Sequence, residues 1–245
     1  MAMLNALLNF VYPPNCPACG IRLPIETERC ICAACIAKIE RIVEPFCSIC
    51  GEPLRPASMD ESGQCLRCRA SARRFRSARS AARYDPSSEV APGALGVIIR
   101  RHKYGLDQSL TRAMAECLGA TLPYVRGEHD LVVPVPLHRA RLRWRGFNQA
   151  ALLGIEVARR LGCAFDAGCL ERVRATPPQT ARDHGARRRN VRRAFRAIDR
   201  GRLRGHRVLL VDDVMTTGAT ADECAEVLLA AGARTVDVFT LARAL

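Results

Sequence analysis

Two adjacent carboxylates followed by small hydroxyl residues form the densest chemical signal in this sequence. Asp212 and Asp213 end the apolar run Val208 to Val211, and the loop 215–220 follows them. This loop consists of Met215, Thr216, Thr217, Gly218, Ala219 and Thr220. Free backbone N–H groups at the start of a helix bind phosphate, threonine hydroxyls add donors, and a glycine lets the backbone approach closely. The loop therefore predicts a phosphate site.

The two carboxylates predict a different ligand group, because their charges would repel a phosphate placed against them. They suit a neutral polyol, such as ribose hydroxyls, or a hydrated Mg²⁺ ion. We expect both at the exposed end of a strand, where open α/β sheets bind their ligands. The structural alternative is a helix capped by Thr217 after a buried strand, with both aspartates solvated.

Arginine-rich segments on either side could supply positive charge to such a site. The first segment contains Arg139, Arg141, Arg143 and Arg145. It directly follows the run 133–138, which ends in Pro136, Leu137 and His138. The other lies in 179–195 and includes Arg187, Arg188 and Arg189. Arginine binds pyrophosphate oxygens through paired hydrogen bonds. The alternatives are a simple loop–helix junction with Asn148 as its cap, and a disordered basic loop over 179–195.

Eight cysteines form four CxxC pairs before residue 70. The pairs are Cys16–Cys19, Cys32–Cys35, Cys47–Cys50 and Cys65–Cys68. Paired CxxC knuckles at this spacing indicate tetrahedral Cys₄ zinc sites, structural because four thiolates complete the coordination sphere. Two zinc ions are expected, with sequential or interleaved pairing both open and Cys30 as a local ambiguity. Cys117 and Cys224 fall on helical patterns and are expected in the core.

The segments that position these residues alternate between strand and helix. Short apolar runs predict strands at 130–135, 207–211 and 235–239, and helical periodicity covers 148–161 and 219–231. This alternation predicts an α/β domain with a parallel sheet flanked by helices. We divide the chain into a cysteine-rich module (1–70), a basic connector (71–83) and the α/β domain (84–245). The apolar stretch 3–12 predicts a short helix packed on the body.

Composition narrows the classes of function. The formal net charge is +14, with only two lysines, so arginine carries nearly all of it. An anionic partner, either a phosphate compound or nucleic acid, explains this charge, as does compositional bias. No apolar run approaches the ~20 residues of a membrane span, and no signal peptide is visible. We therefore expect a cytoplasmic protein without a membrane partner.

The string Val208 to Thr220 resembles the phosphoribosyl pyrophosphate (PRPP) motif of type I phosphoribosyltransferases. The resemblance implies that Asp212 and Asp213 contact the ribose hydroxyls and that the 215–220 loop cradles the 5′-phosphate. It places the pyrophosphate loop at Pro136, Leu137 and His138. A closing loop over 179–195 would bring Arg187 and Arg188 to the substrate, and Arg145 would neutralise developing charge.

Three further segments narrow the resemblance to the ComF family of competence proteins. They are Val133–His138, Arg145–Ala150 and the Gln179–Phe195 region, and Ile98–Tyr104 agrees with them. The family implies a type I phosphoribosyltransferase-like sheet behind a zinc module, with PRPP and Mg²⁺ bound. Two functions stay open: pentosyl transfer to an unknown acceptor, or binding of single-stranded DNA with the PRPP site as a sensor or vestige. A competence helicase-type protein is a further expected partner. A third, weaker possibility is transcriptional regulation by PRPP sensing.

Overall fold

The computed structural model describes residues 14–24, 29–54, 61–85, 93–119, 122–175 and 189–244. The helix expected over 3–12 and the predicted ligands Arg187 and Arg188 lie outside these ranges. So does most of the closing loop expected over 179–195.

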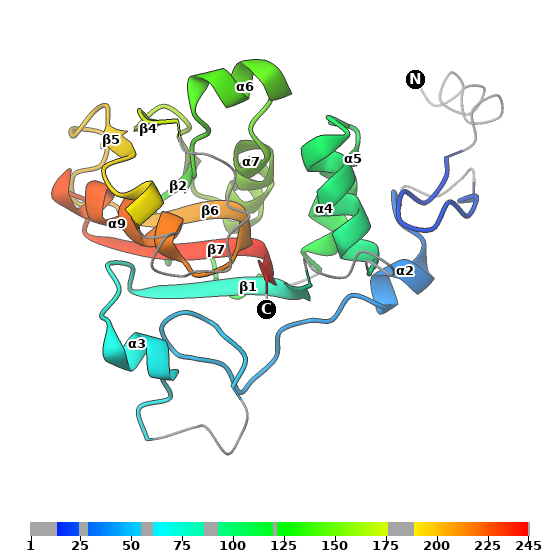
Figure 1. Cartoon of the computed structure of the whole chain (residues 1–245), viewed down its shortest axis with the longest axis horizontal. Coiled ribbons are helices and arrows are strands. Elements are labelled where there is room, and N and C mark those ends of the chain that lie inside the picture. The colour runs from blue at the N-terminus through cyan, green and yellow to red at the C-terminus, as the bar shows by residue number, and fades with distance from the viewer. Residues whose placement is uncertain are drawn as a thin grey trace.

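A five-stranded parallel sheet forms the centre of the fold, in the order β1-β7-β6-β2-β3 (Figure 1). The strands are β1 (Ser77–Tyr84), β2 (Leu131–Pro134), β3 (Ala164–Phe165), β6 (Arg207–Met215) and β7 (Thr235–Ala244). The predicted parallel sheet is confirmed, and three of these strands fall on the predicted apolar runs. However, β6 continues through Asp212 and Asp213 to Met215, because β7 pairs with it to that point.

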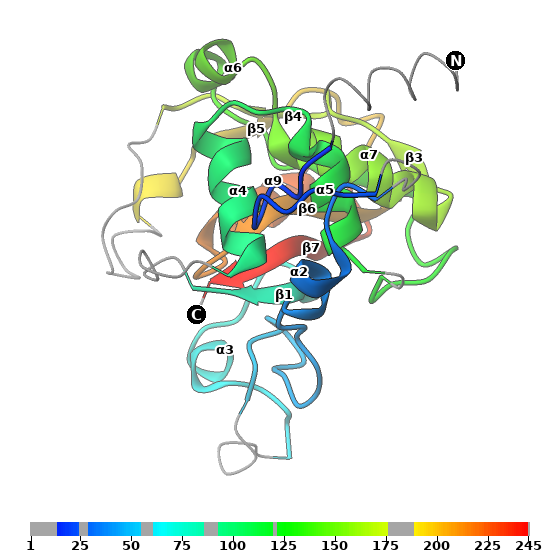
Figure 2. The ribbon, with the colours of Figure 1, turned by 90° about the vertical axis from the view of Figure 1, so that its right-hand side faces the viewer.

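Helices cover both faces of the sheet, as Figures 1 and 2 show. On one face lie α4 (Ala94–Tyr104), α5 (Leu110–Cys117) and α7 (Gln149–Leu161). On the other lie α9 (Ala219–Ala230) and a small antiparallel pair, β4 (Leu170–Arg172) with β5 (Phe195–Ala197). The short helix α6 (Arg139–Arg145) follows the carboxyl end of β2 and projects at the top of Figure 1.

The segment expected to be a basic connector, 71–83, instead supplies the edge strand β1. Its residues pair in parallel with β7, from Ser77 opposite Asp237 to Tyr84 opposite Ala244. Alternate side chains of the strand point inward and are buried, and the Ser80 hydroxyl lies 2.6 Å from that of Thr240. Small residues and arginines are weak strand formers, so the pairing partner rather than local propensity makes this strand.

The cysteine-rich module docks closely on the sheet domain through both of its halves. The first half, which contains α2 (Ala33–Ala37), shares a core with α4 and α5. The second half, which contains α3 (Leu66–Ala70), lies beneath β1 in Figure 2. Its Ile49 carbonyl accepts from the Ala78 amide at 2.6 Å, and the buried Arg243 of β7 donates to the Cys50 carbonyl at 2.8 Å. The domain boundaries at 70 and 84 stay a prediction.

Candidate functional site

The acidic pair lies where the sheet changes its direction of growth. From β2 the chain adds β3 on one side and later β6 on the other, and such a switch point is where open α/β sheets bind ligands. Strand β2 ends at Pro134, opposite Val211 of β6. Beyond that pair, β6 is bordered only by β7 among the described strands, so Asp212 and Asp213 border an open crevice.

Asp213 is buried and paired, which corrects the expectation that both carboxylates are exposed. Its Oδ2 lies 2.9 Å from the Nζ of Lys103, and 9% of its side chain is exposed. Lys103 comes from the last turn of α4, with 23% of its side chain exposed. Successive residues of a strand point to opposite faces, so Asp213 shares the face of α4 while Asp212 points toward the other.

Asp212 carries an unusual protonation equilibrium. Burial, together with the neighbouring Asp213, raises its pKa to about 7, although Lys103 acts in the opposite direction. The backbone N–H of Asp213 donates to Asp212 Oδ1 at 2.9 Å. When a carboxyl group is about half-protonated near neutral pH, a cation or a hydroxyl donor in the crevice stabilises its ionised form.

The loop after β6 has the geometry of a phosphate cradle. Gly218 adopts φ 78°, a left-handed conformation, and α9 starts at the next residue. The Ala219 amide donates to the Thr217 hydroxyl oxygen at 3.3 Å, but the residue that caps α9 is Gly218, without a side-chain cap, so the helix cap expected at Thr217 is not found. The loop residues 215–220 also line a small cavity of about 30 Å³ that reaches Asp212. Because Gly218 provides no side-chain cap, the backbone N–H groups that follow Ala219 at the start of α9 can bind an anion at this position.

A cavity of about 260 Å³ joins the acidic pair to the predicted basic side. Its lining contains Asp212, Asp213, Thr216, Thr220, Pro136, Leu137 and Arg145, all predicted from the sequence. His138 instead caps α6, since its Nδ1 accepts from the Ala140 amide at 3.3 Å. Arg145 is half-buried, and its Nε has no hydrogen-bond partner among the described residues. Burial lowers the pKa of Arg145, so an anionic ligand here would relieve a desolvated charge.

The structure adds lining residues that the site prediction missed. Lys103 and Tyr104 come from α4, Arg141 from α6, Gln149 from α7 and Arg172 from β4. Gln149 is 2% exposed, and its Nε2 has no hydrogen-bond partner among the described residues. The segment Ile98–Tyr104 agrees with the family resemblance, but nothing in it indicates that Lys103 reaches Asp213. Its rarity as one of two lysines was the available signal.

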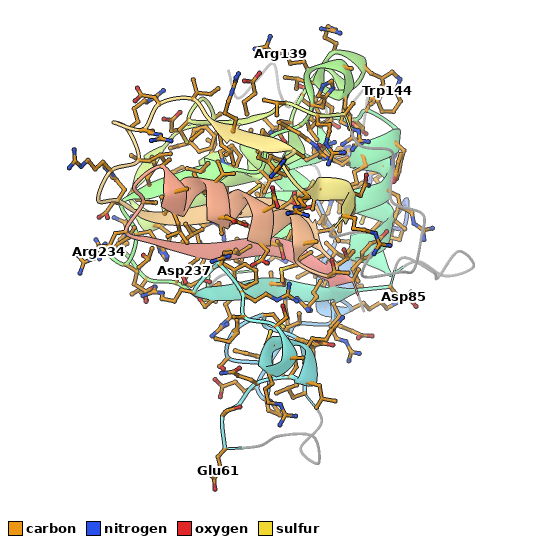
Figure 3. All side chains as sticks on the ribbon, turned by 60° about the vertical axis from the view of Figure 1, so that its left-hand side comes forward. Glu61, Asp85, Arg139, Trp144, Arg234 and Asp237 are labelled. Carbon is orange, nitrogen blue, oxygen red and sulfur yellow. The ribbon has the colours of Figure 1, made fainter. Side chains whose placement is uncertain are left out.

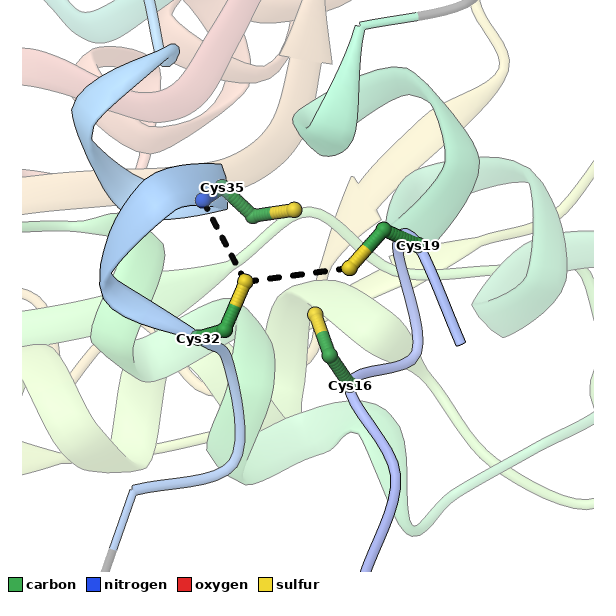
Figure 4. A group of neighbouring side chains, drawn as sticks. All are labelled: Cys16, Cys19, Cys32 and Cys35. Carbon is green, nitrogen blue, oxygen red and sulfur yellow. Dashed lines mark hydrogen bonds between the residues drawn. The ribbon is translucent and has the colours of Figure 1, made fainter. Parts of the chain in front are cut away.

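The eight CxxC cysteines form two clusters, and their pairing is sequential. Cys16, Cys19, Cys32 and Cys35 make one, drawn in Figure 4, and Cys47, Cys50, Cys65 and Cys68 the other. The Sγ atoms of Cys19 and Cys32 are 3.7 Å apart, as are those of Cys50 and Cys65. Two thiolates bound tetrahedrally to one zinc at ~2.3 Å lie roughly 3.8 Å apart, so both clusters fit zinc. Cys30 lies outside them and its amide donates to Glu116.

The second cluster has a cation beside it. Arg243, of which 2% is exposed, places Nη2 3.7 Å from the Sγ of Cys50 and from a carboxylate oxygen of Glu52. Four thiolates around one Zn²⁺ leave an excess of negative charge, which a buried guanidinium offsets. Cys117 and Cys224 are buried on α5 and α9, as predicted.

Comparisons with known proteins match both parts of the chain. A double zinc ribbon domain matches residues 7–70 and a phosphoribosyl transferase domain matches 149–245. The DNA utilization protein YhgH of Salmonella typhimurium is 33% identical over 245 residues, which covers 95% of this chain and 98% of that protein. Competence protein F of Haemophilus influenzae is 30% identical over 228 residues, which covers 87% and 90%. Adenine phosphoribosyltransferase from Thermoanaerobacter pseudethanolicus matches 64% of this chain and 91% of its own, at 18% identity and a TM-score of 0.35.

Proposed function

This chain belongs to the ComF family, with a type I phosphoribosyltransferase-like sheet behind a double zinc ribbon, and we propose that it binds PRPP with Mg²⁺. The observation that carries the proposal is the continuous lining of acidic pair, threonine loop and arginine around one crevice. Each part suits a different portion of PRPP: the acidic pair suits the ribose diol, the threonine loop suits the 5′-phosphate, and the arginine suits the pyrophosphate. No helix among the described residues is long and apolar enough to cross a membrane.

Each group of residues in the site binds the part of PRPP whose charge it complements. The N–H groups and hydroxyls of 215–220 hold the 5′-phosphate at the start of α9. Asp212 accepts from the ribose hydroxyls, and Lys103 keeps the second carboxylate from adding a further uncompensated charge. Arg145, together with the segment at Pro136 and Leu137, lies on the side where the pyrophosphate would be held. The carboxylates of the acidic pair would hold Mg²⁺, which would neutralise negative charge on the pyrophosphate.

The same arrangement supports pentosyl transfer. An acceptor nucleophile would displace pyrophosphate from C1 of the ribose, forming the new bond to C1 as the C1–O bond to pyrophosphate breaks. The guanidinium of Arg145 would stabilise the charge that develops on the leaving group, and the fixed loop would hold the ribose in place. The acceptor is not identified by the lining residues.

Calorimetric titration of PRPP with Mg²⁺ tests this proposal. The wild-type chain should show saturable binding, and the double variant Asp212→Ala with Asp213→Ala should show none. Because the double variant leaves Lys103 unpaired, Asp212→Asn alone serves as the milder variant and should weaken binding while the fold is kept. Asp199→Asn, an exposed carboxylate in a surface turn, is the control. Wild-type affinity in Asp212→Asn and in the double variant would refute the site.

A second candidate function is binding of single-stranded DNA, in the cytoplasm and in contact with a helicase-type protein. It is favoured by the net charge of +14 and by the similarity to a protein named for DNA utilization and to another named for competence. Pyrophosphate release from PRPP, assayed over a panel of bases and amines, separates the two. If no acceptor causes pyrophosphate release, the chain does not transfer the pentosyl group, and binding is left as its function.

A further inference from the structure

Helix α6 contributes nothing to the core, although both of its ends are well formed. None of its seven residues is buried. His138 caps its start, and Gly146 ends it in a left-handed conformation at φ 80°. Arg139 ties it to the β4–β5 pair through Glu171 at 2.8 Å, and Glu171 also pairs with Arg196. A helix that is held firmly but packs no core residue is available for contacts outside the chain.

The side chains of α6 have one chemical character. Its sequence, Arg139-Ala-Arg-Leu-Arg-Trp-Arg145, contains four arginines and no acidic residue. Trp144, the single tryptophan of the chain, is 61% exposed. The guanidinium of Arg145 lies 5.9 Å from the centre of its ring. Figure 3 shows Arg139 and Trp144 projecting from the top of the molecule, far from Arg234.

A second exposed aromatic ring, Tyr104, lines the cavity beside α6. Of the Phe, Tyr and Trp side chains in the described part of the chain, Tyr104 and Trp144 are the exposed ones, at 71% and 61%. Tyr104 lines the 260 Å³ cavity together with Arg141 and Arg145 of α6. The loop after α4 also reaches α6, since a side-chain carbon added at Gly146 would lie 4.0 Å from the Gln108 amide. Arg145 links the two rings, because it lines the cavity with Tyr104 and its guanidinium lies beside the ring of Trp144.

We propose that the α6 rim, formed by Tyr104, Trp144 and the arginines of α6, binds single-stranded nucleic acid across the mouth of the cavity. Exposed aromatic rings offer stacking faces to unpaired bases, and arginines between them hold the phosphates. A purely acidic protein partner would use the charges but leave the two rings unexplained. The inference rests on the second candidate function, and PRPP calorimetry tests the cavity separately.

The unique tryptophan makes the test direct, because all tryptophan emission reports on position 144. Titration with an oligothymidylate about 15 nucleotides long should quench this emission saturably. With a fluorescein-labelled oligomer read by anisotropy, Trp144→Ala should bind about tenfold more weakly. Trp144→Phe, which keeps a stacking ring, should stay close to the wild type. These variants leave the core intact, since no α6 residue is buried.

The arginines are tested through salt dependence. Each phosphate contact on a single strand contributes about 0.7 to the slope of log affinity against log salt. Arg143→Ala, which keeps the anchor at Arg139, should therefore lower this slope by about 0.7, while the exposed Arg234→Ala should leave it unchanged. The proposal is overturned if the oligomer leaves the emission unchanged, if Trp144→Ala binds as the wild type does, or if anionic vesicles quench where the oligomer does not.

Discussion

Replacing Lys103 with methionine tests how much the ion pair between Lys103 and Asp213 contributes to the stability of the fold. The substitution keeps an unbranched side chain, one atom shorter, and removes the ammonium that lies 2.9 Å from Asp213. Removing one partner of a buried ion pair costs about 3–5 kcal/mol. Because Lys103 keeps 23% of its side chain exposed, solvent reduces this cost, and we expect about 3 kcal/mol at pH 8.

The cost should depend on pH in a defined direction. Lys103 acts against burial on the pKa of Asp212, which is about 7, so its loss raises that pKa further. A carboxyl whose folded-state pKa lies above its unfolded value destabilises the fold as pH rises between the two. The penalty of Lys103→Met should therefore be smaller at pH 5.5 than at pH 8.

Urea denaturation at pH 8 and pH 5.5 measures both quantities. Lys103→Arg keeps the charge and should lose much less. Lys103→Met combined with Asp213→Asn should be more stable than Lys103→Met alone, because the carboxylate that Lys103 paired with is then neutral. An equal penalty at both pH values, or a penalty below about 1 kcal/mol at pH 8, would show that the pair does not act as described.

Three further predictions concern the ligands and the loop. Affinity for PRPP with Mg²⁺ should rise from pH 6 to pH 8, because Asp212, with a pKa raised to about 7, must ionise to bind the cation; calorimetry at three pH values checks this, and a flat profile would contradict it. Cys47→Ser should lower bound zinc from two ions per chain to one by atomic spectroscopy, whereas Cys30→Ser, outside both clusters, should keep two; full zinc content in Cys47→Ser would refute the Cys₄ assignment. Gly218→Ala should cost about 1–2 kcal/mol in urea denaturation, because φ is 78° and the new carbon would lie 2.9 Å from the Met215 methyl group; an unchanged midpoint would show that the left-handed turn is not needed.

The sequence predicted the elements whose signals are local. Apolar runs placed β2, β6 and β7, and periodicity placed α7 and α9, because burial on both faces and amphipathic packing leave direct traces in residue order. The cysteine spacing predicted both clusters for the same reason. Strand β1 was missed because alanine, serine and arginine give no strand signal, and its ladder depends on β7 far along the chain.

The site was predicted as residue types but not as a charge network. Asp212, Asp213 and the 215–220 loop were found because they are contiguous. The pairing of Lys103 with Asp213 joins residues 110 positions apart (213 minus 103), and only the packing of α4 on the sheet brings them together. The burial of Gln149 depends in the same way on the position of α7. Long-range pairings of single polar residues leave no periodic pattern to detect.

The pairing of β1 with β7 also sets the order in which this chain can assemble. Ser77 and its partner Asp237 are 160 residues apart, and the side chains of the two hydrogen-bond at 2.7 Å. A nascent chain that has exposed the zinc ribbons and β1 outside the ribosome must therefore extend by another 160 residues before that edge of the sheet can close. Arg243, which caps the second cysteine cluster, arrives with the same strand. Contacts of such separation fold slowly, so the cysteine-rich module gains its final support only after β7 has been synthesised.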